Sequence, residues 1–374
     1  MRGLKDGAPF WLMEQTPSTT ACRDVNPLRR PGELRLATFQ AIAHGADAAL
    51  YFQMRASRGA CEKYHGAVIG HAGRDDTRVF REVAEVGQEL ESLGDRTLGA
   101  RTPARTALLF DWDSWWALEI SDGPSRLVKY PDVVHAHYRA AREAGADVDV
   151  IPQTADLTPY DVVLAPALHM VKGDLATRLE EVTARGGTVL ATFLSGRVDQ
   201  HDRAFLTDVP GPLAPLMGIH VDEWDARPPE FTQPIPELQA EARLVFELVL
   251  PRGAEPVATY GTDFYAGTPA VTRNRFGDGE GWYVATALDQ PGVDQVVRRI
   301  LARHDLLGPY ADHPAVETAT RVTPDGTPLL FLLNHAPEPA RLTAHTTAID
   351  LLTGKRVEQG DPLVLDPLGV AILQ

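Results

Sequence analysis

Short apolar runs alternate with amphipathic stretches along the first part of the chain. Two runs, Ala8–Met13 and Ala48–Met54, are almost wholly apolar, and the first ends abruptly in Glu14. Runs of this length, bounded by turn-forming residues, are typical of strands buried on both faces, as in parallel sheets. Each run is followed by a polar loop and then by apolar residues at helical spacing, in 34–43 and 79–93. The pattern predicts two strand–loop–helix units of a parallel sheet or a barrel.

Further along the chain, strand-like and helix-like segments continue to alternate. This alternation predicts a doubly wound α/β domain with helices on both faces of its sheet. The proline-rich stretch Val209–Ile235 is expected to be an irregular surface insertion, and the glycine-rich Phe276–Trp282 a hairpin turn. The expected strands are Thr106–Phe110, Val148–Ile151, Tyr160–Ala165 and Gly187–Phe193, and the expected helices are Tyr130–Ala144, Leu175–Arg185 and Gln295–Leu306.

The last part of the chain changes character again. Three short apolar runs, Leu329–Leu333, Ala348–Leu352 and Val370–Leu373, are separated by turn-forming residues and lack helical periodicity. They predict a small antiparallel β domain. The whole pattern divides the chain into three domains, which are residues 1–95, 96–312 and 313–374.

Composition and charge narrow the class of protein. The formal net charge is −15 and the pI is near 5.2, which argues against nucleic acid or an anionic membrane as a partner. The two cysteines, Cys22 and Cys61, imply no disulfide framework and fit a reducing compartment, so we expect a cytoplasmic location. No apolar run reaches the roughly 18 residues that a membrane-spanning helix needs.

Two acidic residues and a histidine near the first two strands are candidates for chemistry. Glu14 ends a buried strand, where barrel enzymes keep catalytic groups, although position alone favours a capping or salt-bridged glutamate. Glu62 and His65 lie three residues apart in the loop after the second strand, and both side-chain types hydrogen-bond sugar hydroxyls. The alternative is a solvated loop in which Glu62 pairs with Lys63. Adding His71 produces no familiar metal-ligand spacing, so no metal site is predicted.

A second acidic pair lies just beyond the strand expected at 106–110. Asp111 and Asp113 occupy the edge where open α/β sheets bind ligands. Alternate acidic residues there can hold a metal, but aspartates at strand ends often cap helices or turns, and we favour capping. Trp112, Trp115 and Trp116 in the same segment fit a core, an interface or a sugar-stacking role, and the sequence does not decide among these.

An ordered series of five sequence blocks closely resembles the β-galactosidases of glycoside hydrolase family 42. Each block alone is weak evidence, whereas five in order at compatible spacing are specific. Family members have a catalytic (β/α)8 barrel, then a flavodoxin- or amidotransferase-like domain used in trimerisation, then a small β domain. The resemblance therefore identifies residues 1–95 as the last two βα units of the barrel. The blocks are Phe10–Ser18 (FWLMEQTPS), Asn26–Gly32 (NPLRRPG), Ala43–Asp47 (AHGAD), Tyr51–Arg55 (YFQMR) and Glu62–Ala67 (EKYHGA).

The resemblance also implies roles for individual residues. Glu14 matches the nucleophile of a retaining mechanism, and Phe52 matches an aromatic residue at the floor of the site. Glu62 and His65 match residues that hydrogen-bond galactose hydroxyls. Cys22 stands where many members carry a tryptophan, which weakens the expectation of a stacked sugar there and leaves substrate preference open. No cofactor is implied.

The resemblance covers only part of a catalytic barrel. A (β/α)8 barrel takes about 250 residues, and a retaining glycosidase needs a nucleophile and an acid/base carboxyl about 5–5.5 Å apart. The family's acid/base glutamate, in an Asn-Glu pair, and the zinc-binding cysteine cluster of some members belong to the missing part. Asp24 and Glu62 are the only nearby acidic candidates to replace that glutamate. We therefore expect a β-galactosidase chain that lacks its acid/base and is inactive, or nearly so, by itself.

The expected partners follow from the same resemblance. They are a β-galactoside or galacto-oligosaccharide substrate, further copies of the chain in a homotrimer, and an upstream chain that completes the barrel. Two barrel units by themselves expose strand edges and apolar helix faces, so poor solubility or association through that surface is expected. The alternative is a non-catalytic oligomerisation or carbohydrate-binding protein, in which the α/β domain is the working part.

Overall fold

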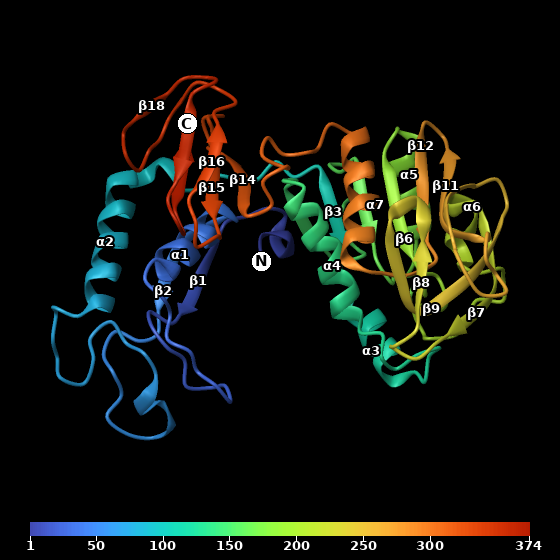
Figure 1. The fold of residues 1–374 in the computed structure, drawn as a ribbon, viewed down its shortest axis with the longest axis horizontal. Helices are drawn as coiled ribbons and strands as arrows, with labels where there is room; N and C mark the ends of the chain where they lie inside the picture. The colour runs from blue at the N-terminus through green and yellow to red at the C-terminus, as the bar shows by residue number, and fades with distance from the viewer. The chain divides into compact units, whose positions relative to one another are not determined.

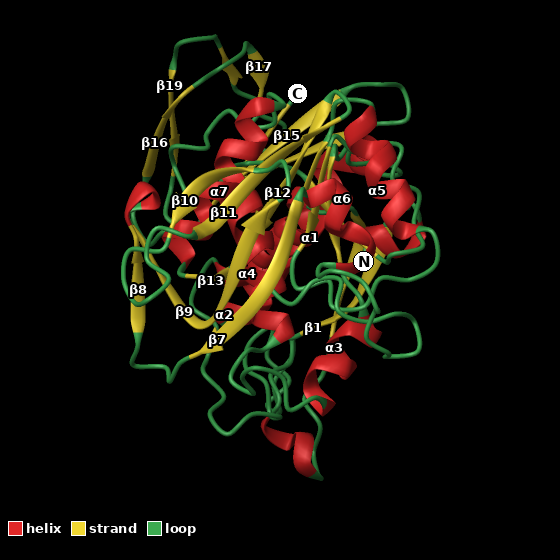
Figure 2. Cartoon of the chain, turned by 90° about the vertical axis from the view of Figure 1, so that its right-hand side faces the viewer, coloured by secondary structure: helices red, strands yellow, loops and turns green.

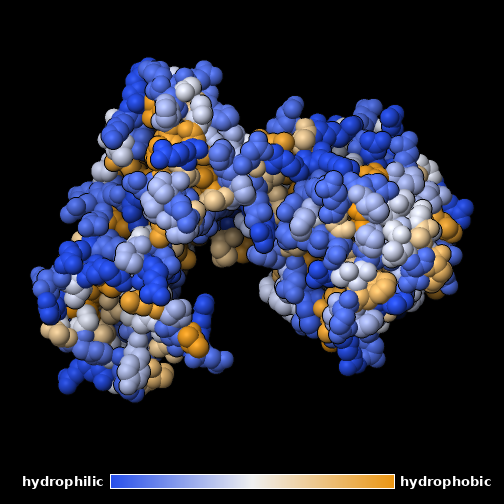
Figure 3. Space-filling view, viewed as in Figure 1, coloured by the Kyte–Doolittle hydropathy of each residue, from blue (hydrophilic) through white to orange (hydrophobic).

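The computed structural model describes residues 1–374 and divides them into two compact units (Figure 1). The first unit joins Met1–Pro103 to Gly308–Gln374, and the second is Ala104–Leu307. The chain is α/β with small antiparallel sheets, as expected (Figure 2). Hydrophilic residues cover most of the visible surface of each unit, with smaller apolar patches between them (Figure 3). None of the helices combines the length and the apolar character that crossing a bilayer would require.

The first unit begins with two strand–helix pairs. Strands β1 (Phe10–Gln15) and β2 (Ala46–Tyr51) are parallel, and α1 (Glu33–Ala43) connects them. Helix α2 (Arg78–Leu93) follows β2, after the short 3-10 turn η2 (Cys61–Tyr64). The order strand, helix, strand, helix is therefore confirmed. The expectation that β1 is buried on both faces is wrong, because β1 pairs with β2 alone and leaves Trp11 64% and Met13 65% exposed.

The C-terminal segment of the first unit consists of short antiparallel sheets. The largest has three strands, β14 (Val316–Val322), β15 (Pro328–Asn334) and β20 (Val370–Leu373). Helix α1 packs against β14 and β15, and their shared core contains Phe39, Ile42, Phe331 and Ile372. The remaining strands form two pairs, β16 (Ala340–Thr343) with β19 (Pro362–Leu365) and β17 (Ala348–Ile349) with β18 (Arg356–Val357).

A buried arginine joins the two segments of the first unit. Arg321 on β14 has no solvent exposure, and its guanidinium donates to the main-chain oxygens of Ile42 (3.0 Å), Ala46 (3.2 Å) and Ala100 (2.7 Å). It also pairs with the carboxylate of Asp47 (2.9 Å). A buried charge is tolerated only when it is paired and fully hydrogen-bonded. Arg321 meets this condition by bonding four points on the N-terminal segment.

The second unit is built on a seven-stranded sheet. The spatial order is β10 (Glu255–Thr259), β11 (Pro269–Phe276), β12 (Gly279–Val284), β6 (Thr188–Thr192), β5 (Val162–Ala165), β3 (Thr106–Leu109) and β4 (Val148–Ile151). Five neighbouring strands of this sheet, β12, β6, β5, β3 and β4, are parallel to one another. Strand β11 pairs antiparallel with β12, and β10 pairs antiparallel with β11 at the edge of the sheet. The hairpin predicted at Phe276–Trp282 is confirmed, since Phe276 pairs with Gly279.

Helices cover both faces of this sheet. Neighbouring residues of a strand point to opposite faces, so each strand contributes side chains to two cores. Leu108 of β3 lies in one core with α4 (Tyr130–Glu143) and α7 (Gln290–Arg303). Its neighbours Ala107 and Leu109 lie in a second core with α5 (Leu175–Ala184) and α6 (Ala214–Met217). The strands read from the sequence as continuous apolar runs are therefore buried on both sides.

A second sheet of the same unit was not predicted. Four antiparallel strands form it, with β9 (Ala240–Pro251) between β7 (Ile219–Ala226) and β13 (Thr286–Leu288), and with β8 (Thr232–Ile235) also paired to β9. The expectation that Val209–Ile235 is an irregular insertion is wrong, because β7 and β8 both belong to this stretch. Pro234 lies in β8, whose only partner is β9, so proline occurs here on a strand without a second neighbour to bond.

His137 on α4 is expected to make the second unit less stable in acid. Its buried ring donates Nδ1–H to the Val133 carbonyl (2.8 Å), and burial lowers the pKa of the imidazole from 6.5 to about 4. The unfolded chain binds this proton below a pH of about 6.5. The folded chain binds it only below the lowered pKa, so stability is lost as the pH falls through that window. From pH 7 to pH 5 we expect this group to cost roughly 2 kcal/mol.

The measurement is the free energy of urea unfolding at pH 7 and pH 5, for the unchanged chain and for His137→Leu. The variant should lose less stability on acidification than the unchanged chain does. Burial also lowers the pKa of His169 and of His304, so a smaller pH dependence of the same sign should remain. An identical loss in the two proteins would contradict the prediction.

Candidate active site

Glu14 is the penultimate residue of β1, and its side chain is exposed. Its carboxylate forms no hydrogen bond or ion pair within the chain, so the alternative of a capping or salt-bridged glutamate does not describe this structure. A carboxylate without protein partners at the end of a strand is free to contact a ligand. Glu14 therefore has the accessibility that a nucleophile needs.

The backbone that carries Glu14 is fixed by a buried polar network. Gln15 is buried and donates Nε2–H to the Thr38 hydroxyl on α1 (2.7 Å), which in turn lies 3.3 Å from the Tyr51 hydroxyl on β2. Burial raises the pKa of Tyr51, so the phenol stays protonated and able to donate. Sequence reasoning missed this network. Its only signal was a glutamine next to Glu14 in an otherwise apolar strand.

Phe52 and His65 lie beside the end of β1. The parallel register places Gln15 opposite Tyr51, and the Phe52 amide donates to the Gln15 carbonyl (3.1 Å). Phe52 is thus at the same edge of the sheet as Glu14, because parallel strands end together. The Phe52 and His65 rings meet edge to face, with centroids 5.1 Å apart and planes at 79°. The structure therefore brings three of the four predicted site residues to one edge.

Glu62 belongs to η2, in the loop that carries His65. This loop is held against the loop after β1, because the Gly66 amide donates to the Thr19 carbonyl (2.7 Å). A Cβ on Gly66 would lie only 2.6 Å from the Thr19 nitrogen, so glycine is required for this approach. The expected alternative, a pair between Glu62 and Lys63, is absent, since the Lys63 ammonium bonds the Ala60 carbonyl. The Glu62 carboxylate is exposed and unpaired.

Three family models match successive parts of the chain. The model described as "Beta-galactosidase" matches residues 1–93, "Beta-galactosidase trimerisation domain" matches 104–307, and "Beta-galactosidase C-terminal domain" matches 315–374. The chain belongs to glycoside hydrolase family 42. All four candidate site residues of this family 42 chain lie in the segment matched as "Beta-galactosidase".

Individual relatives extend over the whole family 42 chain. It is 45% identical over 383 residues to the β-galactosidase BgaA of Planococcus sp. (strain 'SOS Orange'). This match covers 100% of the chain and 56% of BgaA. The β-galactosidase structure from Bacillus circulans sp. alkalophilus is 41% identical with a TM-score of 0.95, over 100% of the chain and 56% of its own. The β-galactosidase structure from Halorubrum lacusprofundi is 31% identical with a TM-score of 0.86, and the match covers 100% of this chain and 54% of that structure's chain. The chain spans about half the length of the curated relatives it matches.

The other candidate groups of the family 42 chain have structural partners. Asp111 caps the helix α3 (Trp112–Ile120), accepting from the Ser114 amide (2.8 Å), and it also pairs with Lys172 (2.6 Å), as does Asp113. The favoured capping role is therefore confirmed for Asp111. His71 bonds the Ser57 carbonyl (2.8 Å), and no group of three or more His, Cys, Asp or Glu side chains is arranged to hold a metal.

Proposed function

We propose that this chain contributes the nucleophile to a retaining β-galactosidase, which releases terminal β-D-galactosyl residues from β-galactosides or galacto-oligosaccharides. One observation carries the proposal. In a chain of family 42, the unpaired carboxylate of Glu14 lies at the end of β1, where a parallel neighbour places Phe52 and the His65 ring. A carboxylate at the end of a parallel strand is suited to attack a bound sugar from a fixed position.

The proposed reaction is a double displacement. The Glu14 carboxylate attacks the anomeric carbon while the glycosidic oxygen leaves with a proton from a general acid, and water then releases galactose with the acid acting as base. The acid must lie about 5–5.5 Å from the nucleophile. Asp24 and Glu62 are both exposed loop residues rather than strand-end residues, and Glu62 is proposed to bind the sugar. We therefore assign the acid to the part of the enzyme that this chain does not span.

The neighbouring residues are proposed to bind the galactosyl group. The Glu62 carboxylate has no protein partner and can accept hydrogen bonds from two hydroxyls. His65 Nδ1 contacts the Gly66 carbonyl (3.0 Å), so Nδ1 carries the proton and Nε2 is left to accept from a hydroxyl. Phe52, packed against His65, offers an apolar ring at the floor of the site.

Residues 1–95 are proposed to be the end of a (β/α)8 barrel, completed by a chain segment that precedes them in the relatives, and residues 313–374 to be the small C-terminal β domain. In support, β1 and β2 are parallel with helices following each, and their free side is apolar. Trp11, Met13 and Met54 are between 60% and 65% exposed, and Leu50 and Phe80 line a shallow apolar hollow. We further propose that residues 104–307 form the flavodoxin- or amidotransferase-like domain of a homotrimer, and that the enzyme is cytoplasmic.

An activity assay with an aryl β-galactoside tests the proposal. The isolated chain should give no turnover above the buffer rate. A chimera in which the part of BgaA outside the match precedes this chain should hydrolyse the substrate and give β-galactose as the first product. A folded chimera that binds galactose yet shows no turnover would favour the alternative of a non-catalytic carbohydrate-binding protein.

A further inference from the structure

Helix α3 presents an unpartnered apolar face. Trp112, Trp116 and Ile120 are four residues apart and therefore share one side of the helix. They are 54%, 54% and 80% exposed. Trp115 and Leu118 point the other way and pack against the core of the unit, which settles Trp115 as a core residue. Two tryptophans and an isoleucine on one exposed face are unusual for a surface without a binding role.

Trp116 is the less restrained of the two exposed tryptophans. Trp112 stacks on Trp115, with centroids 5.1 Å apart and planes at 15°, and also meets Phe110 edge to face. The only aromatic ring that Trp116 meets is that of Trp112, with ring centroids 5.9 Å apart. Its indole N–H has no hydrogen-bond partner in the chain. Trp116 therefore offers an apolar body and one unused donor.

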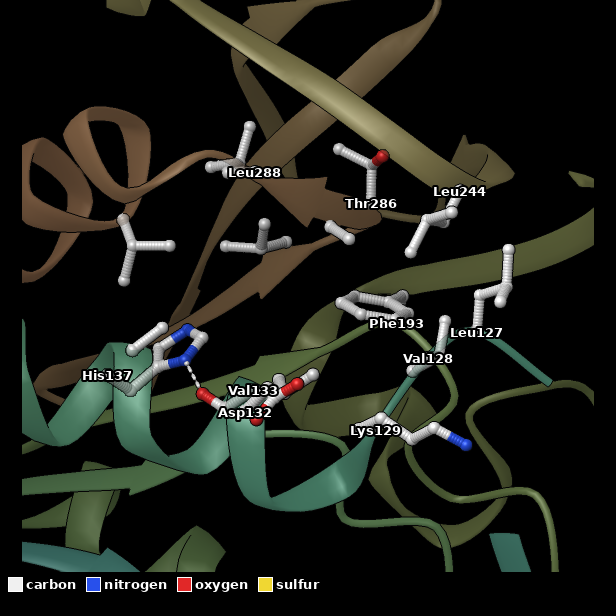
Figure 4. Close-up of a pocket in the computed structure, with 14 residues that line it drawn as sticks. Leu127, Val128, Lys129, Asp132, Val133, His137, Phe193, Leu244, Thr286 and Leu288 are labelled. Atoms are coloured by element: carbon white, nitrogen blue, oxygen red, sulfur yellow. Dashed lines mark hydrogen bonds between the residues drawn. The ribbon is translucent and has the colours of Figure 1, made fainter. Parts of the chain in front are cut away.

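The same unit contains a cavity of about 190 Å3, which is lined mostly by apolar side chains and can receive an apolar group (Figure 4). Apolar side chains line most of it, among them Val133, Phe193, Leu244 and Leu288. Cavities for drug-sized ligands measure about 300–1,000 Å3, so this one suits a single side chain better than an oligosaccharide. His137 is one of the lining residues, and its ring points toward the other side chains of the cavity (Figure 4).

His137 leaves the cavity with one unused acceptor. The Val133 carbonyl can only accept, so Nδ1 carries the proton that bonds it, and burial keeps the ring neutral. The Nε2 lone pair therefore faces the cavity and has no protein partner, while the side chain is only 4% exposed. The best occupant of this cavity is an apolar group that carries an N–H or O–H.

A second copy of this chain is the occupant that the observations favour. The α3 face and the cavity both lie within residues 104–307, the part matched by the trimerisation-domain model. A closed ring of three copies requires heterologous contacts, in which each copy offers one surface and receives its neighbour on another. Tryptophans are enriched at the centres of such interfaces. One chain thus carries both an unused donor, the Trp116 indole N–H on the exposed face of α3, and an unused acceptor, His137 Nε2 in the cavity.

We propose that Trp116 of one copy enters the cavity of the next copy and donates its indole N–H to His137 Nε2. Trp112 and Ile120 then pack around the mouth of the cavity, and the contact repeats head to tail until the ring closes. This inference rests on the trimer in the proposed function and names the surfaces that form it.

Sedimentation equilibrium of the full chain tests the contact. Trp116→Ala should raise the dissociation constant of the trimer by roughly 30-fold or more, as expected for a central tryptophan. Trp116→Phe keeps one aromatic ring but loses the N–H donor and the smaller ring of the indole, so it should raise the constant by about 3- to 10-fold, less than Trp116→Ala. Trp224→Ala is the matched control, because Trp224 is 55% exposed in the same unit but lies on β7. If the copies instead associated through the exposed side of β1 and β2, the dissociation constants of Trp116→Ala, Trp116→Phe and Trp224→Ala would not differ from one another.

A second variant tests the cavity without disturbing the buried histidine. Leu288 lines the cavity and is only partly buried, so Leu288→Trp should fill it from within and weaken the trimer as strongly as Trp116→Ala. An unchanged constant for Trp116→Ala in a chain that does form trimers would overturn the contact alone and leave the trimer standing. A monomeric unchanged chain would overturn both. The activity of the chimera is measured separately, so failure of catalysis is told apart from either result.

Discussion

Glu14→Gln should lower the hydrolysis of an aryl β-galactoside by at least about 10³-fold in the chimera that joins this chain to the remainder of BgaA. The amide has nearly the shape of the carboxylate but cannot form the covalent glycosyl intermediate, so the first displacement fails. The Glu14 side chain is exposed and makes no bond within the chain, so the substitution should leave stability unchanged. The measurement is kcat together with the melting temperature of both proteins.

Glu62→Gln is the matched control, since it makes the same change at the other unpaired carboxylate of the site. It should raise KM or lower kcat by about 10- to 100-fold, because it weakens a hydrogen bond to substrate without removing the attacking group. Azide separates the two roles further. With Glu14→Ala, azide can take the place of the lost carboxylate and attack the anomeric carbon directly, which yields an α-galactosyl azide. Glu14→Gln retaining more than a tenth of the activity, or no azide product, would contradict the nucleophile assignment.

The hydrophobic pattern predicted most elements of the sheet in the second unit because those strands are buried on both faces. Val162–Ala165 is a continuous apolar run and Thr188–Thr192 an apolar run between two threonines, and such runs are typical of central strands. The pattern failed at β7 and β8, where one side of the sheet is polar and proline interrupts the run. Proline is compatible with β8 because that strand has only one neighbour, and this is known only once the pairing is seen.

The candidate site was also predicted only in part: the sequence indicated its residues but not how they come together. Sequence blocks located Glu14, Phe52, Glu62 and His65, because each lies in a short segment that resembles the family. What brings Glu14, Phe52 and His65 to one edge is pairing and contact between segments, such as Gly66 against Thr19. Such contacts depend on the fold and leave no periodic signal in the sequence. The same holds for the three tryptophans of α3, which differ in role only through the side of the helix they occupy.

Arg321→Met should destabilise the first unit by about 3–5 kcal/mol, the cost of removing one partner from a buried ion pair. Methionine fills a similar volume but has no donors. The Asp47 carboxylate, 18% exposed, would lose its cation, and the carbonyls of Ile42, Ala46 and Ala100 would lose their hydrogen bonds. Hydrogen exchange measured on peptides of α1, β14 and β15 should report faster opening, with peptides from 104–307 unchanged.

Arg341→Met controls for the loss of a positive charge, because Arg341 on the same C-terminal segment is exposed and makes no hydrogen bond or ion pair. It should alter stability by less than about 0.5 kcal/mol. Asp47→Asn should fall between the two, since it keeps an acceptor for Arg321 but leaves the buried guanidinium without its counter-charge. If Arg321→Met unfolds at the same denaturant concentration as Arg341→Met, the two segments are held together by their apolar packing and by the bonds of Glu317 to Gln40 and His44, without a contribution from Arg321. The graded order of the three variants would instead mean that the strand end bearing Glu14 depends, through α1 and Asp47, on one cation supplied by the C-terminal segment.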